Sequence, residues 1–159
     1  MATINKNLSH YDKEQVPDGS DLKIGLVVSE WNEEITENLF KGALETILDC
    51  GVTKDNIVRW NVPGSFELPL GCKKMISSHQ VNAVVAIGSV IRGETSHFDY
   101  VCSATAQGIM NLNLETDVPV IFCVLTDDNI QQSRDRSGGK HGNKGAEAAI
   151  AAIKMASLK

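Results

Sequence analysis

The most chemically dense segment of the chain runs from Gly88 to Tyr100, directly after the apolar run Ala83 to Ile87. It contains hydroxyl side chains, a glycine that permits a tight turn, and His97. If a helix begins here, its unpaired N–H groups can hold a phosphate or an oxyanion. A histidine beside such a site can take up and give protons near neutral pH, although a lone histidine is usually structural. We therefore predict that the part from Gly88 to His97 is the active-site loop of an enzyme, with His97 as the catalytic residue.

Trp31 and Glu67 also lie in short segments that follow predicted strands. The indole of Trp31 could stack on a flat heterocycle; the alternative is a tryptophan that closes the end of the sheet against solvent. Glu67 lies in the stiff segment Pro63 to Pro69. Its carboxylate could accept hydrogen bonds from ligand N–H or O–H groups. Alternatively, Glu67 could have only a structural role, because the helix dipole stabilises a carboxylate at a helix start by about 0.3–1 kcal/mol. Both residues are candidates for ligand binding.

A basic, glycine-rich segment from Arg134 to Gly145 follows the last predicted strand. It does not have the spacing of a P-loop, and no G-x-G-x-x-G follows any strand, so a nucleotide phosphate loop is not supported. The planar guanidinium of Arg136 can bind a different phosphate through two hydrogen bonds, or it can face water as most surface arginines do. Arg136 is therefore a candidate anion-binding residue.

Four segments have the apolar patterns of β-strands, and three of them are continuous apolar runs, as expected for strands covered on both faces: residues 24–28, 57–62, 83–87 and 118–125. Between and after them lie segments of helical length, from Asn32, a good N-cap, to about Cys50, from Phe98 to about Glu115, and from Gly145 to Leu158, where many alanines indicate close helix packing. This alternation favours an α/β fold, a three-layer α/β/α sandwich with a central, mainly parallel four-stranded sheet of the flavodoxin-like kind. Such sheets bind ligands beyond the carboxyl ends of their strands, where the candidate residues lie.

Length and charge exclude several classes of protein. The chain has 159 residues, 42% of them hydrophobic, and we assign residues 21–159 to a single domain. Residues 1–20 are polar and are expected to form a flexible N-terminal arm. A net charge of −5 without a basic stripe argues against nucleic acid as a partner. The sequence shows neither an apolar stretch of roughly 20 residues nor the pattern of a secretory signal. We therefore expect no membrane contact and a cytoplasmic location.

The four cysteines are widely spaced and lie within apolar or helical patterns: Cys50, Cys72, Cys102 and Cys123. Their spacing does not match a metal site, and nothing else in the sequence indicates an oxidising compartment. We expect buried, reduced thiols and no metal.

Several of these segments occur together in the order and spacing of one known family. From about Leu22 to the C-terminus the chain resembles 6,7-dimethyl-8-ribityllumazine synthase, the penultimate enzyme of riboflavin biosynthesis. The resemblance rests on Trp31-Asn32, Pro63 to Pro69, Gly88 to Tyr100, Phe122 and Arg136 to Gly145. It implies condensation of 5-amino-6-(D-ribitylamino)uracil with 3,4-dihydroxy-2-butanone 4-phosphate, with release of inorganic phosphate and water. It implies no metal and no organic cofactor.

The resemblance also implies a role for each matching residue. Trp31 and Phe122 correspond to the residues that form the aromatic and apolar walls around the pyrimidine. The surroundings of its ring and ribityl chain correspond to Ser65, Phe66, Glu67, Ser89, Val90 and Ile91. Glu94, Thr95 and Arg136 correspond to residues that contact the phosphate. At Glu94 the contact is made by backbone N–H groups rather than by the carboxylate. His97 corresponds to the residue that transfers protons.

Departures from the family pattern are few, and none removes a functional group. Trp31 stands where Phe is common, Cys123 where Gly is usual, and Ser89 where Thr or Cys is common. The larger indole could also hold a finished flavin.

Members of this family place their sites between the subunits of a pentamer, and some close pentamers into an icosahedral shell that can associate with riboflavin synthase. The Arg136 to Gly145 connection has no insertion relative to the shell-forming pattern, so we favour a shell. Two alternatives stay open: a non-catalytic flavin-binding or container protein on the same scaffold, against which His97 and Arg136 argue, and another flavodoxin-like enzyme acting on a phosphorylated metabolite.

Overall fold

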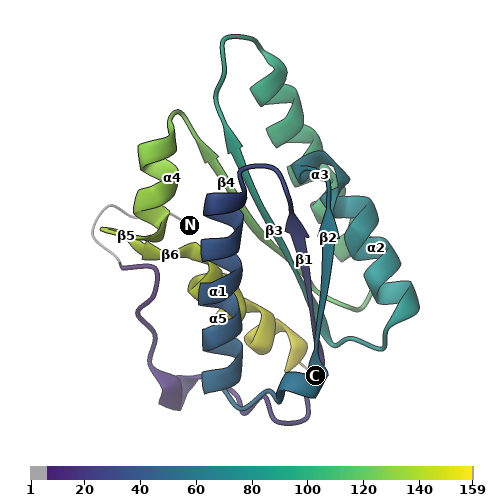
Figure 1. The fold of residues 1–159 in the computed structure, drawn as a ribbon. Coiled ribbons are helices and arrows are strands. Elements are labelled where there is room, and N and C mark those ends of the chain that lie inside the picture. Colours follow the sequence, from purple (N-terminus) through teal and green to yellow (C-terminus); the bar gives the residue numbers. More distant parts are fainter. Residues whose placement is uncertain (1–6, 159) are drawn as a thin grey trace.

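A parallel sheet forms the centre of the computed structural model, which describes residues 7–158. Its strand order is β2-β1-β3-β4 (Figure 1). The strands are β1 (Ile24–Ser29), β2 (Ile57–Val62), β3 (Ala83–Ile91) and β4 (Val120–Asp127). Their carboxyl ends point to the top of Figure 1. The predicted four-stranded parallel sheet is confirmed.

Helices cover both faces of this sheet (Figure 1). On one face, α1 (Glu33–Asp49) and α5 (Lys144–Ala156) pack together, and α2 (Leu68–Ser78) and α3 (His97–Glu115) cover the other. A short helix, α4 (Ile130–Arg136), follows β4 and leads into an antiparallel hairpin of β5 (Ser137–Gly139) and β6 (Gly142–Asn143). Short 3-10 helices are η1 (Lys13–Gln15), η2 (Lys54–Asn56) and η3 (Ser65–Glu67). The three-layer α/β/α sandwich is confirmed.

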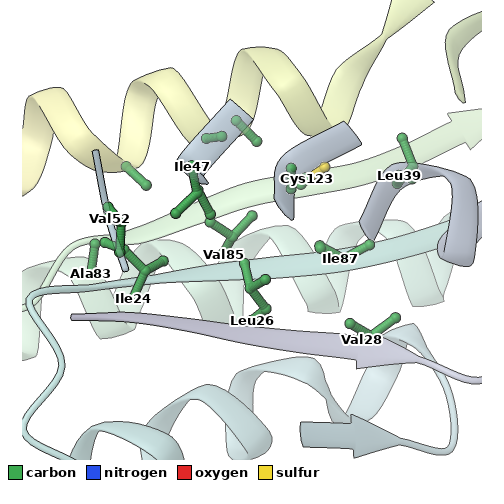
Figure 2. Packing of buried hydrophobic residues seen from close by; sticks show 14 of the residues in the cluster. Ile24, Leu26, Val28, Leu39, Ile47, Val52, Ala83, Val85, Ile87 and Cys123 are labelled. Carbon is green, nitrogen blue, oxygen red and sulfur yellow. The ribbon is translucent and has the colours of Figure 1, made fainter. Parts of the chain in front are cut away.

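Alternate residues of the strands enter two separate apolar clusters. Leu26, Val85 and Ile87 pack toward α1 and α5 (Figure 2), whereas Val27 and Val84 pack toward α2 and α3. All five side chains are fully buried. Burying a side chain of this size stabilises the fold by about 1.5–3 kcal/mol. The strand ends that carry the candidate residues are therefore anchored in a core on both faces of the sheet.

β3 and β4 end later than their apolar patterns predict. β1 pairs with β3 only as far as Ile87, but β4 continues the pairing up to Ile91 and Asp127. Hydrogen bonds to β4 thus extend β3 beyond the last residue it shares with β1. This extension carries Ser89 to Ile91 toward the region above the sheet where a ligand can bind.

The alanine-rich last helix packs closely on α1. Ala149 and Ala152 are fully buried. A Cβ atom on Gly145 would collide with the carbonyl oxygen of Leu39. Small residues therefore permit this close approach, as the sequence predicted.

Residues 7–20 of the predicted arm run along α1 and the hairpin; residues 1–6 lie outside the described part of the chain. Backbone N–H of Leu8 donates to the carbonyl of His141 at 2.8 Å. Farther along, Asp49 accepts a hydrogen bond from Tyr11 at 2.7 Å and pairs with Lys13 at 2.9 Å. The boundary at residue 20 and the flexibility of the arm stay predictions.

The cysteines are free thiols. Cys50, Cys72 and Cys123 are buried as predicted, whereas Cys102 on α3 is only half-buried. Burial raises the pKa of Cys72 and of Cys123 to about 12, so both stay protonated near neutral pH. Among residues 7–158 no helix is long and apolar enough to cross a membrane.

Candidate active site

A cleft of about 650 Å³ opens beyond the carboxyl ends of β1, β2 and β3. The β1–α1 loop, η3, the end of β3 and the start of α3 form its walls. Its lining residues are Trp31, Asn32, Gly64, Ser65, Phe66, Glu67, Ser89, Val90, Ile91, Gly93, Thr95, His97, Phe98 and Val101. Most of the candidates named from the sequence thus meet in one place, although they come from three separate segments of the chain, residues 31–32, 64–67 and 89–101.

Two buried hydroxyl groups are left without a protein partner in this cleft. Ser65 and Ser89 are 5% and 1% exposed, and no described residue forms a hydrogen bond with either Oγ atom. An unsatisfied buried hydroxyl costs about 1–3 kcal/mol. A Cβ atom on Gly88 would lie 2.6 Å from the Oγ of Ser65, so glycine lets this strand approach η3. Both serines line the cleft, and described residues leave the hydrogen-bonding capacity of both hydroxyls unused.

Trp31 is placed by an unusual backbone conformation at the next residue. Asn32 has φ 60° and ψ 47°, the left-handed region that asparagine tolerates better than most residues. It occupies the N-cap position of α1 as predicted, but its side chain makes no capping hydrogen bond. Instead its Nδ2 donates to the carbonyl oxygen of Ser89 at 2.8 Å. Asn32 thus ties the β1–α1 loop to the end of β3.

Two large aromatic rings at the cleft are exposed. Trp31 is 72% and Phe66 60% exposed to solvent. The backbone N–H of Trp31 donates to the carbonyl of Pro63 at 3.2 Å, which links its loop to the segment that carries Phe66. Exposed aromatic surface on this scale is typical of a binding site, where rings stack on a flat ligand.

Glu67 is the last residue of η3 and precedes α2. It occupies the N-cap position of α2 but makes no side-chain capping hydrogen bond. Thr105 on α3 donates from its Oγ1 to the backbone carbonyl of Ser65 at 3.1 Å, which fixes this short helix. Glu67 thus lines the cleft on a fixed backbone, and its carboxylate makes no hydrogen bond with a described residue.

His97 is the first residue of α3 and lines the cleft. Its backbone N–H donates to the Oγ1 of Thr95 at 3.4 Å, while the cap residue Ser96 makes no side-chain capping bond. A Cβ atom on Gly93 would meet nothing within 4 Å, so the loop before His97 is open on this side. The imidazole thus lies at a helix start beside an accessible cavity, a suitable position for proton transfer.

Sequence reasoning assigned no role to Arg92, which holds this loop. Its guanidinium binds Asp99 through Nη2 at 3.0 Å and Asp128 through Nε at 3.0 Å, and it lies 4.1 Å from the ring centre of Phe98. Hydrogen bonds to Asp99 and Asp128 raise the pKa of Arg92. Arg92 therefore fixes the first turn of α3 against the end of β4. No local pattern in the sequence reveals this contact, because it depends on the path of the loop.

Three sequence candidates do not line the cleft of this chain: Glu94, Phe122 and Arg136. Glu94 is exposed on the loop before α3. Phe122 lies on β4, is 37% exposed, and shares the α3 face of the sheet with Val120 and Val124. Arg136 is the last residue of α4. No lysine or arginine is among the residues that line the cleft, so the cleft lacks a cationic side chain for a phosphate.

Residues 7–158 contain no group of three or more His, Cys, Asp or Glu side chains that could hold a metal ion. The chemistry that the cleft's own groups offer is stacking, hydrogen bonding and proton transfer.

Comparison with known proteins agrees with the resemblance seen in the sequence. The profile of the family described as 6,7-dimethyl-8-ribityllumazine synthase matches residues 21–159. A protein of that name from Christiangramia forsetii is 66% identical, with 100% of this chain and 95% of its own length covered. Proteins of the same name from Flavobacterium johnsoniae and Porphyromonas gingivalis are 63% and 55% identical, covering 100% and 99% of this chain and 84% and 98% of their own. The chain therefore belongs to the 6,7-dimethyl-8-ribityllumazine synthase family.

Proposed function

We propose that the chain condenses 5-amino-6-(D-ribitylamino)uracil with 3,4-dihydroxy-2-butanone 4-phosphate to give 6,7-dimethyl-8-ribityllumazine, phosphate and water. Family membership supports this reaction. The observation that carries it is the cleft, which joins exposed aromatic rings, two unpaired buried hydroxyls and His97 at the carboxyl ends of the strands. A flat, polyhydroxylated heterocycle offers the matching groups.

The pyrimidine substrate occupies the cleft in this proposal. Trp31 stacks on its ring, and the end of β3 from Ser89 to Ile91 borders it. Ser65 and Ser89 supply the buried hydroxyls, with Phe66 beside them, and Glu67 accepts hydrogen bonds from N–H or O–H groups. This assignment gives ligand partners to the Oγ atoms of Ser65 and Ser89, with which no described residue forms a hydrogen bond.

The phosphate substrate needs a cation that the cleft does not contain. We assign this role to Arg136 of a neighbouring copy of the chain, with Phe122 of that copy closing the pyrimidine site. Backbone N–H groups at Glu94 and Thr95, near the start of α3, contribute on the side of the cleft chain, because helix starts favour anions.

Proton transfer links the steps of the reaction. The pyrimidine amine attacks the ketone and forms an imine with loss of one water, phosphate leaves by elimination, and the second nitrogen attacks the carbonyl that results and closes the ring with loss of a second water. His97 takes up and gives protons in these steps and provides about 10²–10⁴-fold of the acceleration. Holding the two substrates in line provides more, up to roughly 7–11 kcal/mol in favourable cases. No cofactor takes part.

The proposed site requires an oligomer, and the outer face of α3 offers apolar surface for one. Tyr100, Met110 and Leu114 are 75%, 60% and 80% exposed and share one helix face. We propose a pentamer, and a shell of pentamers that associates with riboflavin synthase in the cytoplasm. Light scattering that gives the mass of a single pentamer would contradict the shell.

The experiment that tests the function mixes the purified protein with both substrates. Lumazine absorbance and released phosphate should rise together in equal amounts. A protein that binds the pyrimidine or riboflavin but forms no product would favour the alternative, a flavin-binding or container protein. Phosphate release without lumazine would favour an enzyme acting on another phosphorylated metabolite.

A further inference from the structure

Arg136 differs from the other three arginines of the chain in how its guanidinium is held. Arg59 and Arg92 each engage all three of their guanidinium nitrogens with side-chain oxygens. Arg134, two residues before Arg136, binds Glu34 through Nε at 2.7 Å and Nη2 at 2.9 Å. Arg136 uses one nitrogen only, Nη1, in its contacts with described residues.

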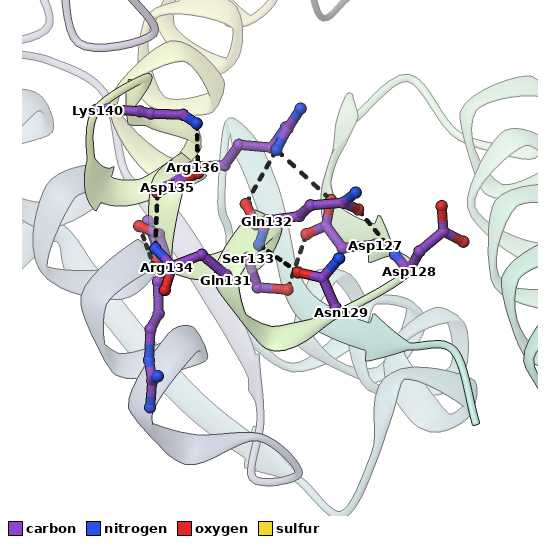
Figure 3. Close-up of polar contacts among 11 residues, drawn as sticks. Asp127, Asp128, Asn129, Gln131, Gln132, Ser133, Arg134, Asp135, Arg136 and Lys140 are labelled. Carbon is purple, nitrogen blue, oxygen red and sulfur yellow. Dashed lines mark hydrogen bonds and ion pairs between the residues drawn. The ribbon is translucent and has the colours of Figure 1, made fainter.

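Both contacts of Arg136 lie at the junction of β4 and α4 (Figure 3). Nη1 donates to the backbone carbonyl of Gln132 at 3.0 Å and lies 4.0 Å from Oδ1 of Asp127. Figure 3 shows both interactions leaving the same nitrogen, with the rest of the guanidinium turned away from the two partners. Nε and Nη2 make no contact with a described residue, so their N–H groups can donate to an anion.

Asp127 is an unusual residue for this position, because its carboxylate is buried. The residue is 7% exposed, and its Oδ2 accepts a hydrogen bond from Ser133, which is fully buried, at 2.8 Å. The backbone carbonyl of Asp127 accepts from the N–H of Arg92 at 2.9 Å. A buried charge is costly unless it is paired and hydrogen-bonded. Ser133 fixes one carboxylate oxygen, and Arg136 is the cation that faces the other.

We propose that Asp127 is a positioning residue for the phosphate substrate: it holds one edge of Arg136 so that the opposite edge faces the anion. At 4.0 Å the carboxylate orients the guanidinium without closing a two-bond pair of the kind that occupies Arg134. Ser133 acts through Asp127 by fixing its carboxylate. The inference rests on the proposed role of Arg136.

The test compares Asp127→Asn with Asp135→Asn in the assembled enzyme. Asp135 is the matched control because it is a buried carboxylate, 9% exposed, that lies on α4 beside Arg136 but contacts Gln131 and Lys140 instead of Arg136. Asp127→Asn should raise KM for the butanone phosphate about fivefold, the size expected for losing one partly exposed ion pair. KM for the pyrimidine and kcat should change by less than about twofold. Asp135→Asn should leave all three unchanged.

Ser133→Ala, which leaves the charge of Asp127 in place, should raise the same KM about twofold. It also tests the proposal if Asp127→Asn does not assemble. In an Arg136→Ala background, Asp127→Asn should have no further effect on this KM.

The outcomes separate the inference from the function on which it rests. If Arg136→Ala raises KM for the phosphate substrate but Asp127→Asn behaves like Asp135→Asn, the positioning role of Asp127 is wrong. A lower KM in Asp127→Asn would also overturn it, because the carboxylate would then compete with phosphate. An unchanged KM in Arg136→Ala would overturn the role of Arg136 itself.

Discussion

The cleft and the α4–hairpin region are built in different ways. In the cleft, Ser89 lies on β3 and Trp31 comes two residues after the end of β1, and both strands are buried on both faces, so the apolar core fixes their backbone. The α4–hairpin region depends on polar contacts, such as the pair of Arg134 with Glu34 and the hydrogen bond from the arm to His141. In the proposed function, the ring is therefore recognised by a core-anchored surface, and the phosphate is held by a separate element that polar and charged contacts fix.

Removing the proton-transfer residue should have the largest effect. His97→Ala should lower kcat by about 10²–10⁴-fold, because one general acid or base contributes this much, and leave the KM of both substrates nearly unchanged. Steady-state kinetics with saturating substrates measures this. A wild-type kcat would remove His97 from the mechanism.

Removing Arg136 should affect binding more than turnover. Arg136→Ala should raise KM for the phosphate substrate about 10–100-fold, since hydrogen bonds to charged groups contribute about 1.5–3 kcal/mol. KM for the pyrimidine should stay near its wild-type value. Equal increases in both KM values would contradict the separation of the two regions.

Much of the cleft could be predicted from the sequence, and the reasons are local. The apolar patterns predict the strands, Trp31, Glu67 and His97 lie in the segments that follow their carboxyl ends, and parallel topology then brings these segments together. The true end of β3 at Ile91 could not be predicted, because it depends on pairing with β4 rather than on periodicity.

The α4–hairpin region was harder to predict from the sequence. α4 is short and polar and carries no apolar period, so it was missed. The different contacts of Arg134 and Arg136, two neighbours of the same type, depend on the face of α4 that each occupies. Likewise, Asn32 was expected to cap α1 with its side chain, but a more distant carbonyl at Ser89 takes that hydrogen bond.

A smaller change in the cleft tests the stacking surface. Trp31→Phe should weaken riboflavin binding about two- to tenfold, because a smaller ring loses stacking area. Fluorescence titration with riboflavin measures the affinity. The matched control is Trp60→Phe, since Trp60 lies on β2, with its ring 5.3 Å from that of His79 and outside the cleft lining. Equal effects of the two variants would contradict stacking on Trp31.

The smallest effect is expected where the arm meets α1. Hydrogen bonds from Lys13 and then Tyr11 lower the pKa of Asp49, so the folded arm favours its ionised form. This stabilisation is present above the ordinary pKa and is lost as the pH falls through the lowered value. Asp49→Asn should therefore speed hydrogen exchange in residues 7–20 and 137–143 up to about fivefold at neutral pH.

Residues 83–91 of β3 provide the internal control in the same hydrogen-exchange experiment. Their exchange should not change, because the core rather than the arm holds them. Faster exchange throughout the chain would show that the arm stabilises the whole fold.

The central claim, that each active site joins the cleft of one chain to Arg136 of another, is tested most directly by complementation. His97→Ala and Arg136→Ala chains are co-expressed, and mixed oligomers are purified by two different tags. Random mixing gives about a quarter of the sites an intact cleft and an intact neighbouring Arg136. We predict activity near a quarter of wild type, well above that of either parent. Activity no greater than the average of the two parents would show that His97 and Arg136 act in the same chain.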